Sequence, residues 1–393
     1  MSLFKKRLSL ICLISALAAS CISPAVTCSA YAEEAVSEQN TEVKAVQTFT
    51  IEDAVNYAKE HSTSLAAAKA SEAYAKSSAN EARVNKSKLK DNKNLTVTDI
   101  SPILVTSGYA YDAALANYRI AQRTVLQTEY TLESNVSILF YTYLSNAEKV
   151  TIAKNSLSSA QEITKASEIK YSNGFISDID MEQTRIAEEE ALSALNKAEM
   201  DLELSMLNLK SGISYPLDQP LQITGSFTPP TKEETSYEAA LARAEKSISR
   251  ANNEDSFKVA QQKKKVYQGY YTSNQPAWHS AEAEYISAEL KYNNALNDER
   301  INLYSAWSSV QATSERINTA RKYLELAQKR VDAAKLSYSL GSMSTKEYLD
   351  SVRELYSTKN SLLDGELGLY SVNEQYRMLF DCENTIFEED TVK

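Results

Sequence analysis

Small and apolar residues recur along this chain at alternating spacings of four and three residues, the period of an amphipathic helix packed against another helix. Charged and polar residues fill the positions between them. Alanine and serine occupy several of the recurring positions, where they allow neighbouring helices to approach closely. The pattern predicts long coiled-coil helices with seams at Ala191, Leu195, Ala198, Leu202, Ser205 and Leu209; at Ala114, Tyr118, Ala121 and Val125; and at Leu349, Val352, Tyr356, Leu363, Leu367 and Tyr370.

Proline and glycine divide these periodic segments into two similar sets. We expect helices over 51–90, 109–170 and 177–210, and again over 237–267, 277–340 and 344–380. A helix of 60 residues is about 90 Å long, which no small globular core can bury. The chain is therefore predicted to be all-α, built from two tandem repeats of long antiparallel coiled-coil helical hairpins.

A short turn ends the longest helix of each set, and the two turns match at an offset of 167 residues. The glycine turns read YSNGFISDID from Tyr171 and YSLGSMSTKE from Tyr338. A glycine after a helix takes the left-handed conformation that other residues resist. A serine three residues later caps the next helix, and an acid three further on completes a capping box. We therefore expect both hairpins to turn in the same way.

The first 32 residues resemble a secretory signal peptide, with Lys5, Lys6 and Arg7 before an apolar stretch and Ala30-Tyr31-Ala32 as the cleavage site. A retained anchor and a lipoprotein cysteine at Cys21 are the alternatives. Loss of residues 1–32 changes the net charge from −10 to about −13, which argues against a nucleic-acid binder. Only Cys382 remains, so no intramolecular disulfide is expected.

The expected division is a signal peptide (1–32), an N-terminal linker (33–48), a first helical repeat (49–210), a proline-containing linker (211–235), a second helical repeat (236–380) and an acidic C-terminal tail (381–393). No later apolar stretch is long enough for a membrane-spanning helix. The exported chain is expected outside the cytoplasm.

Catalytic motifs are missing from the sequence. We find no phosphate-binding loop, metalloprotease helix or nucleophile elbow. His61 and His279 have no cysteine partners, so no metal site is predicted. The 24 tyrosines, with Trp278 and Trp307, could form a carbohydrate or base-stacking surface, but their spread along heptads favours helix packing. We predict no catalytic residues, no cofactor and no enzyme activity.

The two turns and the repeat layout resemble the TolC-like outer membrane efflux protein family over about residues 48–380. That family has a G-x-x-[AST]-x-x-[DE] motif at each hairpin tip, matched by Gly174, Ser177 and Asp180 and by Gly341, Ser344 and Glu347. The start of the first repeat, TIEDAVNYA from Thr50, is similar to the family's start motif. The resemblance implies a homotrimer whose twelve long helical segments form a hollow tapered α-barrel.

The resemblance also implies partners, namely a periplasmic adaptor (membrane fusion) protein and an inner-membrane pump. The residues that match the adaptor-contacting tips are Gly174, Phe175, Ile176 and Ser177, with Gly341, Ser342, Met343 and Ser344. The alternative role of these residues is helix capping alone, and the two roles are compatible.

Acids beyond the turns match positions that ring the closed pore entrance in the family. They are Glu347 and Asp350 in the second repeat and Asp180 in the first, where Gln183 replaces the second acid. Threefold symmetry would bring six carboxylates together, favour cations and raise some pKa values. The alternative is a capping acid beside a solvated one.

The loops at the opposite end are shorter than the family's β-hairpins. A membrane strand needs about 9–11 residues. Loop 91–109 offers only the strand-like runs 95–98 and 103–106, and loop 268–277 has roughly ten residues. We therefore expect little or no β-barrel.

The same end is basic, with Lys86, Lys88 and Lys90 before the first loop and Lys263, Lys264 and Lys265 before the second. Lysines at helix C-termini favourably offset the macrodipole. The alternative is that they bind an anionic envelope surface, such as lipid headgroups or cell-wall polymer.

The sequence thus predicts an exported channel or tunnel component of a multicomponent efflux or secretion system, a passive conduit that docks an adaptor. The alternative is a helical scaffold or tether of the cell envelope without transport. The expected location is the cell envelope, at the outer membrane in a cell that has one and at the cell surface otherwise.

Overall fold

A computed structural model describes residues 46–90 and 99–380. The expected signal peptide, Cys21, the run 95–98 and the C-terminal tail with Cys382 lie outside the described residues, as does most of the N-terminal linker. The side chain of Lys90 is outside them as well.

Long helices make up almost all of the described chain, which confirms the predicted all-α fold class. The first repeat contains α1 (Ile51–His61), α2 (Thr63–Lys90), α3 (Ser101–Thr106), α4 (Tyr109–Ser172) and α5 (Asp178–Gly212). The second contains α6 (Tyr237–Ala244), α7 (Ile248–Tyr270), α8 (Pro276–Ser339) and α9 (Thr345–Phe380).

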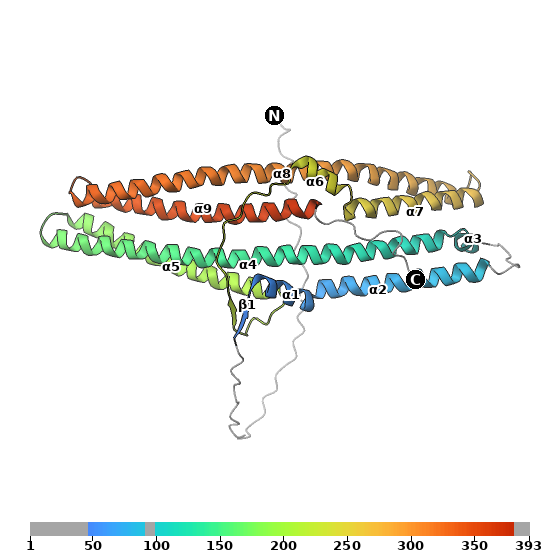
Figure 1. Cartoon of the computed structure of the whole chain (residues 1–393), viewed down its shortest axis with the longest axis horizontal. Coiled ribbons are helices and arrows are strands. Elements are labelled where there is room, and N and C mark those ends of the chain that lie inside the picture. Colours follow the sequence, from blue (N-terminus) through green and yellow to red (C-terminus); the bar gives the residue numbers. More distant parts are fainter. Residues whose placement is uncertain (1–45, 91–98, 381–393) are drawn as a thin grey trace, which may run out of the picture. The chain divides into compact units, whose positions relative to one another are not determined.

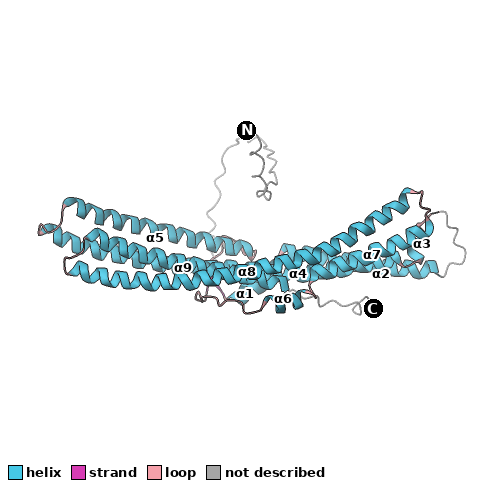
Figure 2. Ribbon diagram, turned by 90° about the horizontal axis from the view of Figure 1, so that it is seen from above, coloured by secondary structure: helices cyan, strands magenta, loops and turns pink. Residues whose placement is uncertain are grey.

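The two longest helices, α4 and α8, run the length of the bundle, and shorter helices cover each half (Figure 1). In the half that contains the glycine turns, the contacts give the order α5–α4–α9–α8. In the other half the order is α2–α4–α7–α8. Figure 2 shows these helices side by side from above. Each half is therefore a layer of four helices, with α8 at one edge.

Two matching hydrophobic cores lie where the short first helix of each repeat meets the long ones. Ala54 and Ala58 of α1 are fully buried against Val136 and Phe140 of α4 and Leu209 of α5. In the second repeat, Ala240 and Ala244 of α6 pack in the same way among Leu303, Val310 and Tyr376. The predicted correspondence between the two repeat starts thus appears as equivalent packing.

Each of the two predicted first helices is broken into two, so the expectation of continuous helices over 51–90 and 237–267 was wrong. The breaks fall at Ser62 and at residues 245–247. Ser62 Oγ accepts a hydrogen bond from Leu65 N (3.3 Å), and Ser247 Oγ accepts one from Arg250 N (3.2 Å). A serine side chain bonded to the backbone three residues later starts a new helix instead of continuing the old one.

The strand-like run 103–106 is helical, which corrects the interpretation of that loop segment. It forms α3, where Asp99 Oδ1 accepts a hydrogen bond from Ser101 N (2.9 Å) and Pro102 occupies the first turn. A side-chain acceptor followed by proline is a strong start signal for a helix. These local signals outweigh the β propensity of Ile103 and Val105.

A small parallel pair of strands, β1 (Gln47–Phe49) and β2 (Leu221–Ile223), was not predicted. Gln47 pairs with Leu221 and Phe49 with Ile223. The Phe49 ring packs against Tyr57 and Tyr215, with centroids 5.4 and 5.9 Å away. The pair fixes the start of the first repeat to the proline-containing linker. Across 46–90 and 99–380, none of the helices is both long enough and apolar enough to cross a bilayer.

Candidate functional site

The two glycine turns have the same backbone geometry. Gly174 and Gly341 have φ values of 72° and 74°, in the left-handed region. Phe175 N donates to Lys170 O, and Ser342 N donates to Ser337 O, both at 2.9 Å. Together with the bonds from the two glycine N–H groups, these close a Schellman motif at the end of α4 and of α8. The predicted glycine conformation is therefore present in both copies.

The serines of both turns cap the helices that follow. Ser177 Oγ accepts from Asp180 N and Ser344 Oγ accepts from Glu347 N, each at 3.2 Å. The carboxylates accept in return from Ser177 N (3.2 Å) and Ser344 N (3.0 Å). Hydrogen bonds from Ser177 lower the pKa of Asp180, and those from Ser344 lower the pKa of Glu347. Within one chain, both acids are held in the ionised form.

The predicted tip residues lie together at one end of the bundle (Figure 1). Most are exposed, and the Phe175 ring is 78 % exposed although it is a large apolar group. Ile176 and Met343, at equivalent positions in the two turns, are the half-buried members. The turns thus combine a rigid backbone with an apolar side chain that has no intramolecular cover.

Contacts between the repeats hold the two hairpins together close to these turns. The Lys170 ammonium of α4 lies 3.5 Å from the centroid of the Tyr338 ring of α8, and Ser167 Oγ lies 3.4 Å from the Tyr338 hydroxyl. Tyr338 in turn stacks on Tyr348 of α9, with centroids 5.0 Å apart. A cluster of buried aliphatic residues from α4, α5, α8 and α9 lies deeper in the bundle. Packed side chains of these four helices therefore support both turns.

Asp350 is exposed and lies one helical turn beyond Glu347, as predicted from its spacing. Its nearest basic group is Arg353, at 3.8 Å, and Arg353 also forms an ion pair with Glu190 of α5. The sequence alone could not indicate the ion pair of Arg353 with Glu190, because the two residues are far apart along the chain. Of the predicted entrance acids, Asp350 therefore lies beside a cation of its own helix.

The predicted basic residues lie at the opposite end, which we call the distal end: the end of α2, α3, the start of α4 and the turn between α7 and α8. Lys263 and Lys264 are half-buried and pair with Glu284 and Glu282 of α8. The Lys86 ammonium lies 5.2 Å from the centroid of the Tyr111 ring. Lys88 and Lys265 are exposed. Two of the six predicted lysines are thus partly neutralised within the chain.

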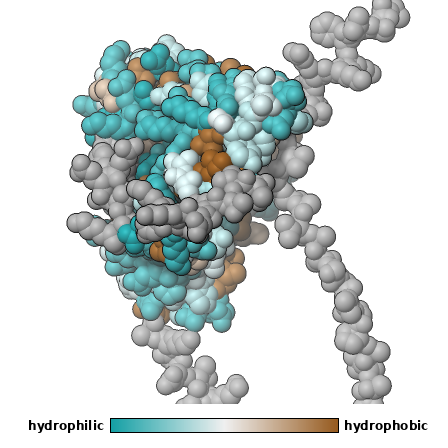
Figure 3. Space-filling model, turned by 90° about the vertical axis from the view of Figure 1, so that its right-hand side faces the viewer, coloured by the Kyte–Doolittle hydropathy of each residue, from teal (hydrophilic) through white to brown (hydrophobic). Residues whose placement is uncertain are grey.

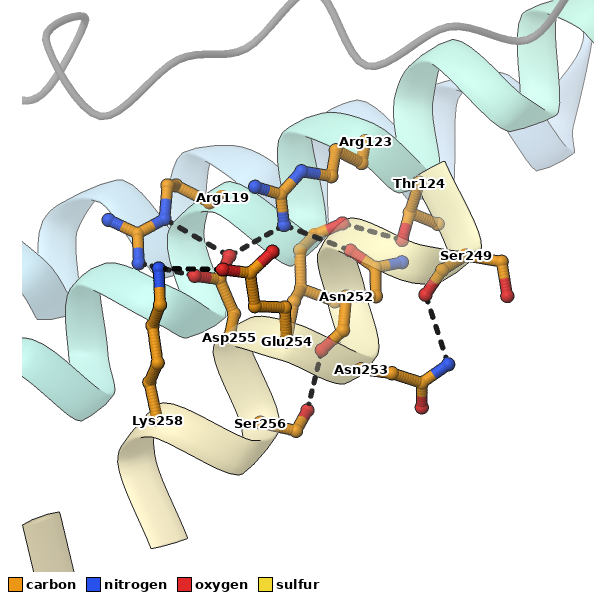
Figure 4. Close-up of polar contacts among 11 residues, drawn as sticks. Arg119, Arg123, Thr124, Ser249, Asn252, Asn253, Glu254, Asp255, Ser256 and Lys258 are labelled. Atoms are coloured by element: carbon orange, nitrogen blue, oxygen red, sulfur yellow. Dashed lines mark hydrogen bonds and ion pairs between the residues drawn. The ribbon is translucent and has the colours of Figure 1, made fainter. Parts of the chain in front are cut away.

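A buried polar cluster that sequence reasoning missed joins the two repeats between these ends (Figure 4). Arg119 and Arg123 of α4 both bind the carboxylate of Asp255 on α7, and Arg123 also donates to Asn252 Oδ1 at 3.1 Å. Burial raises the pKa of Asp255, but hydrogen bonds and charge from the two guanidiniums outweigh it, so that pKa lies below its usual value. The only signal in the sequence was a pair of arginines four residues apart, beside the predicted seam at Tyr118, Ala121 and Val125.

Sequence and structure comparisons agree with this geometry. Residues 107–213 match the sequence profile of a family described as "Outer membrane efflux protein". The predicted resemblance to the TolC-like outer membrane efflux proteins is confirmed. The matched segment spans α4, the first glycine turn and α5. A search of curated protein sequences gave no match.

Solved structures of TolC-like channels share the fold across most of the chain. The outer membrane protein VceC from Vibrio cholerae is 14% identical with a TM-score of 0.69, covering 84% of this chain and 95% of that one. The CmeC outer membrane channel from Campylobacter jejuni is 13% identical with a TM-score of 0.63, covering 86% and 87%. The MtrE outer membrane channel from Neisseria gonorrhoeae is 14% identical with a TM-score of 0.64, covering 84% and 88%. At these identities the likeness is one of fold.

Proposed function

We propose that this chain is a TolC-like conduit component of a multicomponent efflux or secretion system in the cell envelope. The observation that carries the proposal is the pair of matching glycine turns, which lie exposed at one end of two long hairpins. The TolC-like fold and the efflux-family match of residues 107–213 support it. The conduit would perform no chemistry, and a partner pump would supply the energy. Its location would be the outer membrane in a cell that has one, and the cell surface otherwise.

The layer of four helices has two edges that a second copy can cover. On α5, the apolar residues Ile179, Ile186, Met200 and Leu207 are separated by seven or fourteen residues and are all exposed. On α8, Leu326 and Leu336 are exposed in the same half of the bundle, as is Leu340 directly after its last residue. Association of α5 of one copy with α8 of the next is head-to-tail, and such an interface forms a ring when its rotation closes. The family resemblance favours a ring of three.

Native mass spectrometry tests this assembly. The variant Ile186→Glu with Met200→Glu places two charges on the exposed seam of α5 and is expected to leave monomers. Asn208→Glu, an exposed position on the same helix but off the seam, is the matched control and should keep the ring. A monomeric unaltered protein at micromolar concentration would argue against the proposed conduit.

Docking of an adaptor protein at the glycine turns is the second part of the proposal. Phe175 offers an apolar anchor, and a buried aromatic anchor is a common source of binding energy at interfaces. A photo-reactive residue at Phe175 or at Ser342 is expected to crosslink a periplasmic adaptor protein of the same system. The same probe at Leu290, an exposed position on α8 far from the turns, should not. Equal crosslinking at all three positions would contradict specific docking.

We also propose that Asp180, Glu347 and Asp350 make the conduit entrance selective for cations. Glu347→Gln with Asp350→Asn removes two charges per chain, while glutamine can still complete the capping box with Ser344. In planar bilayers this variant should lose cation preference but keep the same fold. Unchanged selectivity would leave Glu347 as a capping acid and Asp350 as a solvated one.

A helical scaffold or tether without transport is the second candidate function. The short connection between α7 and α8 favours this candidate. Only residues 271–275 join the two helices, and they form no further helix or strand that would extend a conduit. Reconstitution separates the two candidates. Conductance in planar bilayers supports a conduit, while trimers without conductance support a scaffold.

A further inference from the structure

The distal end forms one continuous surface from both repeats. Gln262 of α7 donates to Asp112 Oδ2 of α4 at 2.6 Å, which joins the second repeat to the start of the long helix of the first. Lys86 of α2 covers the junction of α3 and α4, where its ammonium lies within 5.2 Å of the Tyr111 ring centroid. Side chains from α2, α3, α4 and α7 can therefore meet the same ligand.

Helix α3 is apolar but buries none of its residues. Its sequence is SPILVT, and Pro102, Ile103, Leu104 and Val105 are all partly exposed. Consecutive residues of a helix point about 100° apart, so a single packing face cannot cover four in a row. Figure 3 looks onto this end and shows a small apolar area within a hydrophilic surface. Such a helix is stable at a site where an apolar medium covers it.

Aromatic side chains with polar tips surround the turn between α7 and α8. Tyr270, Tyr271 and Trp278 are all partly exposed, and the rings of Tyr270 and Tyr271 lie 4.9 Å apart. Tyrosine and tryptophan favour the boundary between lipid and water, because the ring is apolar and its N–H or O–H is polar. This composition is typical of a surface that touches a bilayer.

The charge of the distal end is opposite to that of the chain. Residues 83–90, 99–112 and 262–284 contain seven basic and four acidic residues, whereas the whole chain has a net charge of −10. Lys263 and Lys264 are paired with Glu284 and Glu282, but Lys88 and Lys265 project into solvent. A local excess of positive charge on an acidic protein attracts an anionic surface.

We propose that the distal end docks on the surface of an anionic lipid bilayer, with α3 at the boundary of the acyl chains and Lys88 and Lys265 among the headgroup phosphates. A polyanion such as cell-wall polymer would satisfy the lysines but would leave α3 and Trp278 uncovered, so the apolar side chains favour lipid. This inference goes beyond the proposed conduit and does not depend on it, because it concerns the end opposite to the glycine turns.

Vesicle co-sedimentation of the processed, exported protein tests the proposal, in a Cys21→Ser background so that no acyl chain can be attached there. Binding is expected to vesicles of phosphatidylglycerol and phosphatidylcholine and to be much weaker with phosphatidylcholine alone. Lys88→Glu with Lys265→Glu should weaken binding about fivefold for each lysine and reduce its salt dependence. Leu104→Ser with Val105→Ser should weaken it roughly tenfold or more, with little change in fold because α3 has no buried residue.

The matched control is Lys165→Glu with Ile169→Ser, an exposed basic and apolar pair of α4 near the first glycine turn, which should bind as the unaltered protein does. A second readout uses Trp307→Phe, which leaves Trp278 as the sole tryptophan. Brominated acyl chains in the anionic vesicles should quench its emission. Equal loss in the control, no quenching, or binding to purified anionic wall polymer but not to vesicles would each overturn the proposal.

Discussion

Asp255 of α7 binds Arg119 of α4 with both carboxylate oxygens, Oδ2 accepting from Nε at 3.1 Å and Oδ1 from Nη2 at 2.6 Å. Arg123 adds a third bond to Oδ2 at 2.6 Å. All three side chains are buried, with Asp255 only 4 % exposed. This cluster therefore joins the first repeat to the second through charged hydrogen bonds that are shielded from water.

Asp255→Ala should destabilise the protein by about 3–5 kcal/mol, because it leaves two buried guanidiniums without their counterion. Chemical denaturation followed by circular dichroism measures this change. Glu254→Ala is the control, since the neighbouring acid is half-exposed and forms an ion pair with Lys258 of its own helix at 3.0 Å. It should cost less than about 1 kcal/mol. A similar loss in both variants would contradict a special role for Asp255.

Stability should also fall in acid through Asp255. Its folded pKa lies below the usual value of 3.8, so its contribution is complete above that pH and is lost as the pH falls through the folded pKa. The unfolding free energy of the unaltered protein should therefore decline below about pH 4. Asp255→Asn should have lower stability at neutral pH and a shallower decline in acid.

Alanine at either turn glycine should cost about 1–2 kcal/mol, because Gly174 and Gly341 have positive φ values that a side chain disfavours. At both positions the space that a Cβ would occupy is open, with no other heavy atom within 4 Å, so the cost is conformational rather than steric. Gly368→Ala is the control: it lies inside α9, also has open space, and has no positive φ. It should raise the melting temperature slightly. A destabilised Gly368→Ala variant would contradict this reasoning.

Ser344→Ala should raise the pKa of Glu347 toward its usual value of 4.5, because it removes the hydroxyl hydrogen bond of the capping box. NMR titration of the glutamate side chains measures this directly. Ser342→Ala, two residues earlier and outside the capping box, should leave that pKa unchanged. If the pKa did not respond to Ser344→Ala, the capping box would not form in solution.

Tyr376 should lose its contribution to stability in alkali. Its side chain is fully buried, its hydroxyl donates to Thr235 O at 3.1 Å, and burial raises its pKa to about 12. The folded pKa lies above the unfolded value of about 10, so stability is complete below pH 10 and declines as the pH rises toward 12. Tyr376→Phe should cost about 1–2 kcal/mol at neutral pH and show a smaller alkaline decline. Tyr74→Phe, at an exposed tyrosine, should change neither quantity.

The sequence by itself determined the long helices, the duplication and both glycine turns. These features depend on interactions within a few residues, such as the bond from Asp180 N to Ser177 Oγ or the positive φ of Gly174, so local spacing was sufficient. The heptad seam on α5 likewise follows from which of its own residues are apolar.

Only the tertiary structure decided which distant segments meet. Asp255 lies 136 residues from Arg119, and Phe49 pairs with Ile223 of the linker, so neither contact has a local signal. Two elements that were predicted wrongly do have local signals: Ser62 Oγ accepts a hydrogen bond from Leu65 N just after α1 ends at His61, and Asp99 Oδ1 accepts one from Ser101 N before the run at Ile103 that looked like a strand. The distal lysines show the same limit: only the arrangement of α7 beside α8 pairs Lys263 with Glu284 and leaves Lys265 exposed. Local hydrogen bonds therefore determine where the helices of this chain begin and end, and packing between distant helices determines which side chains meet in its sites.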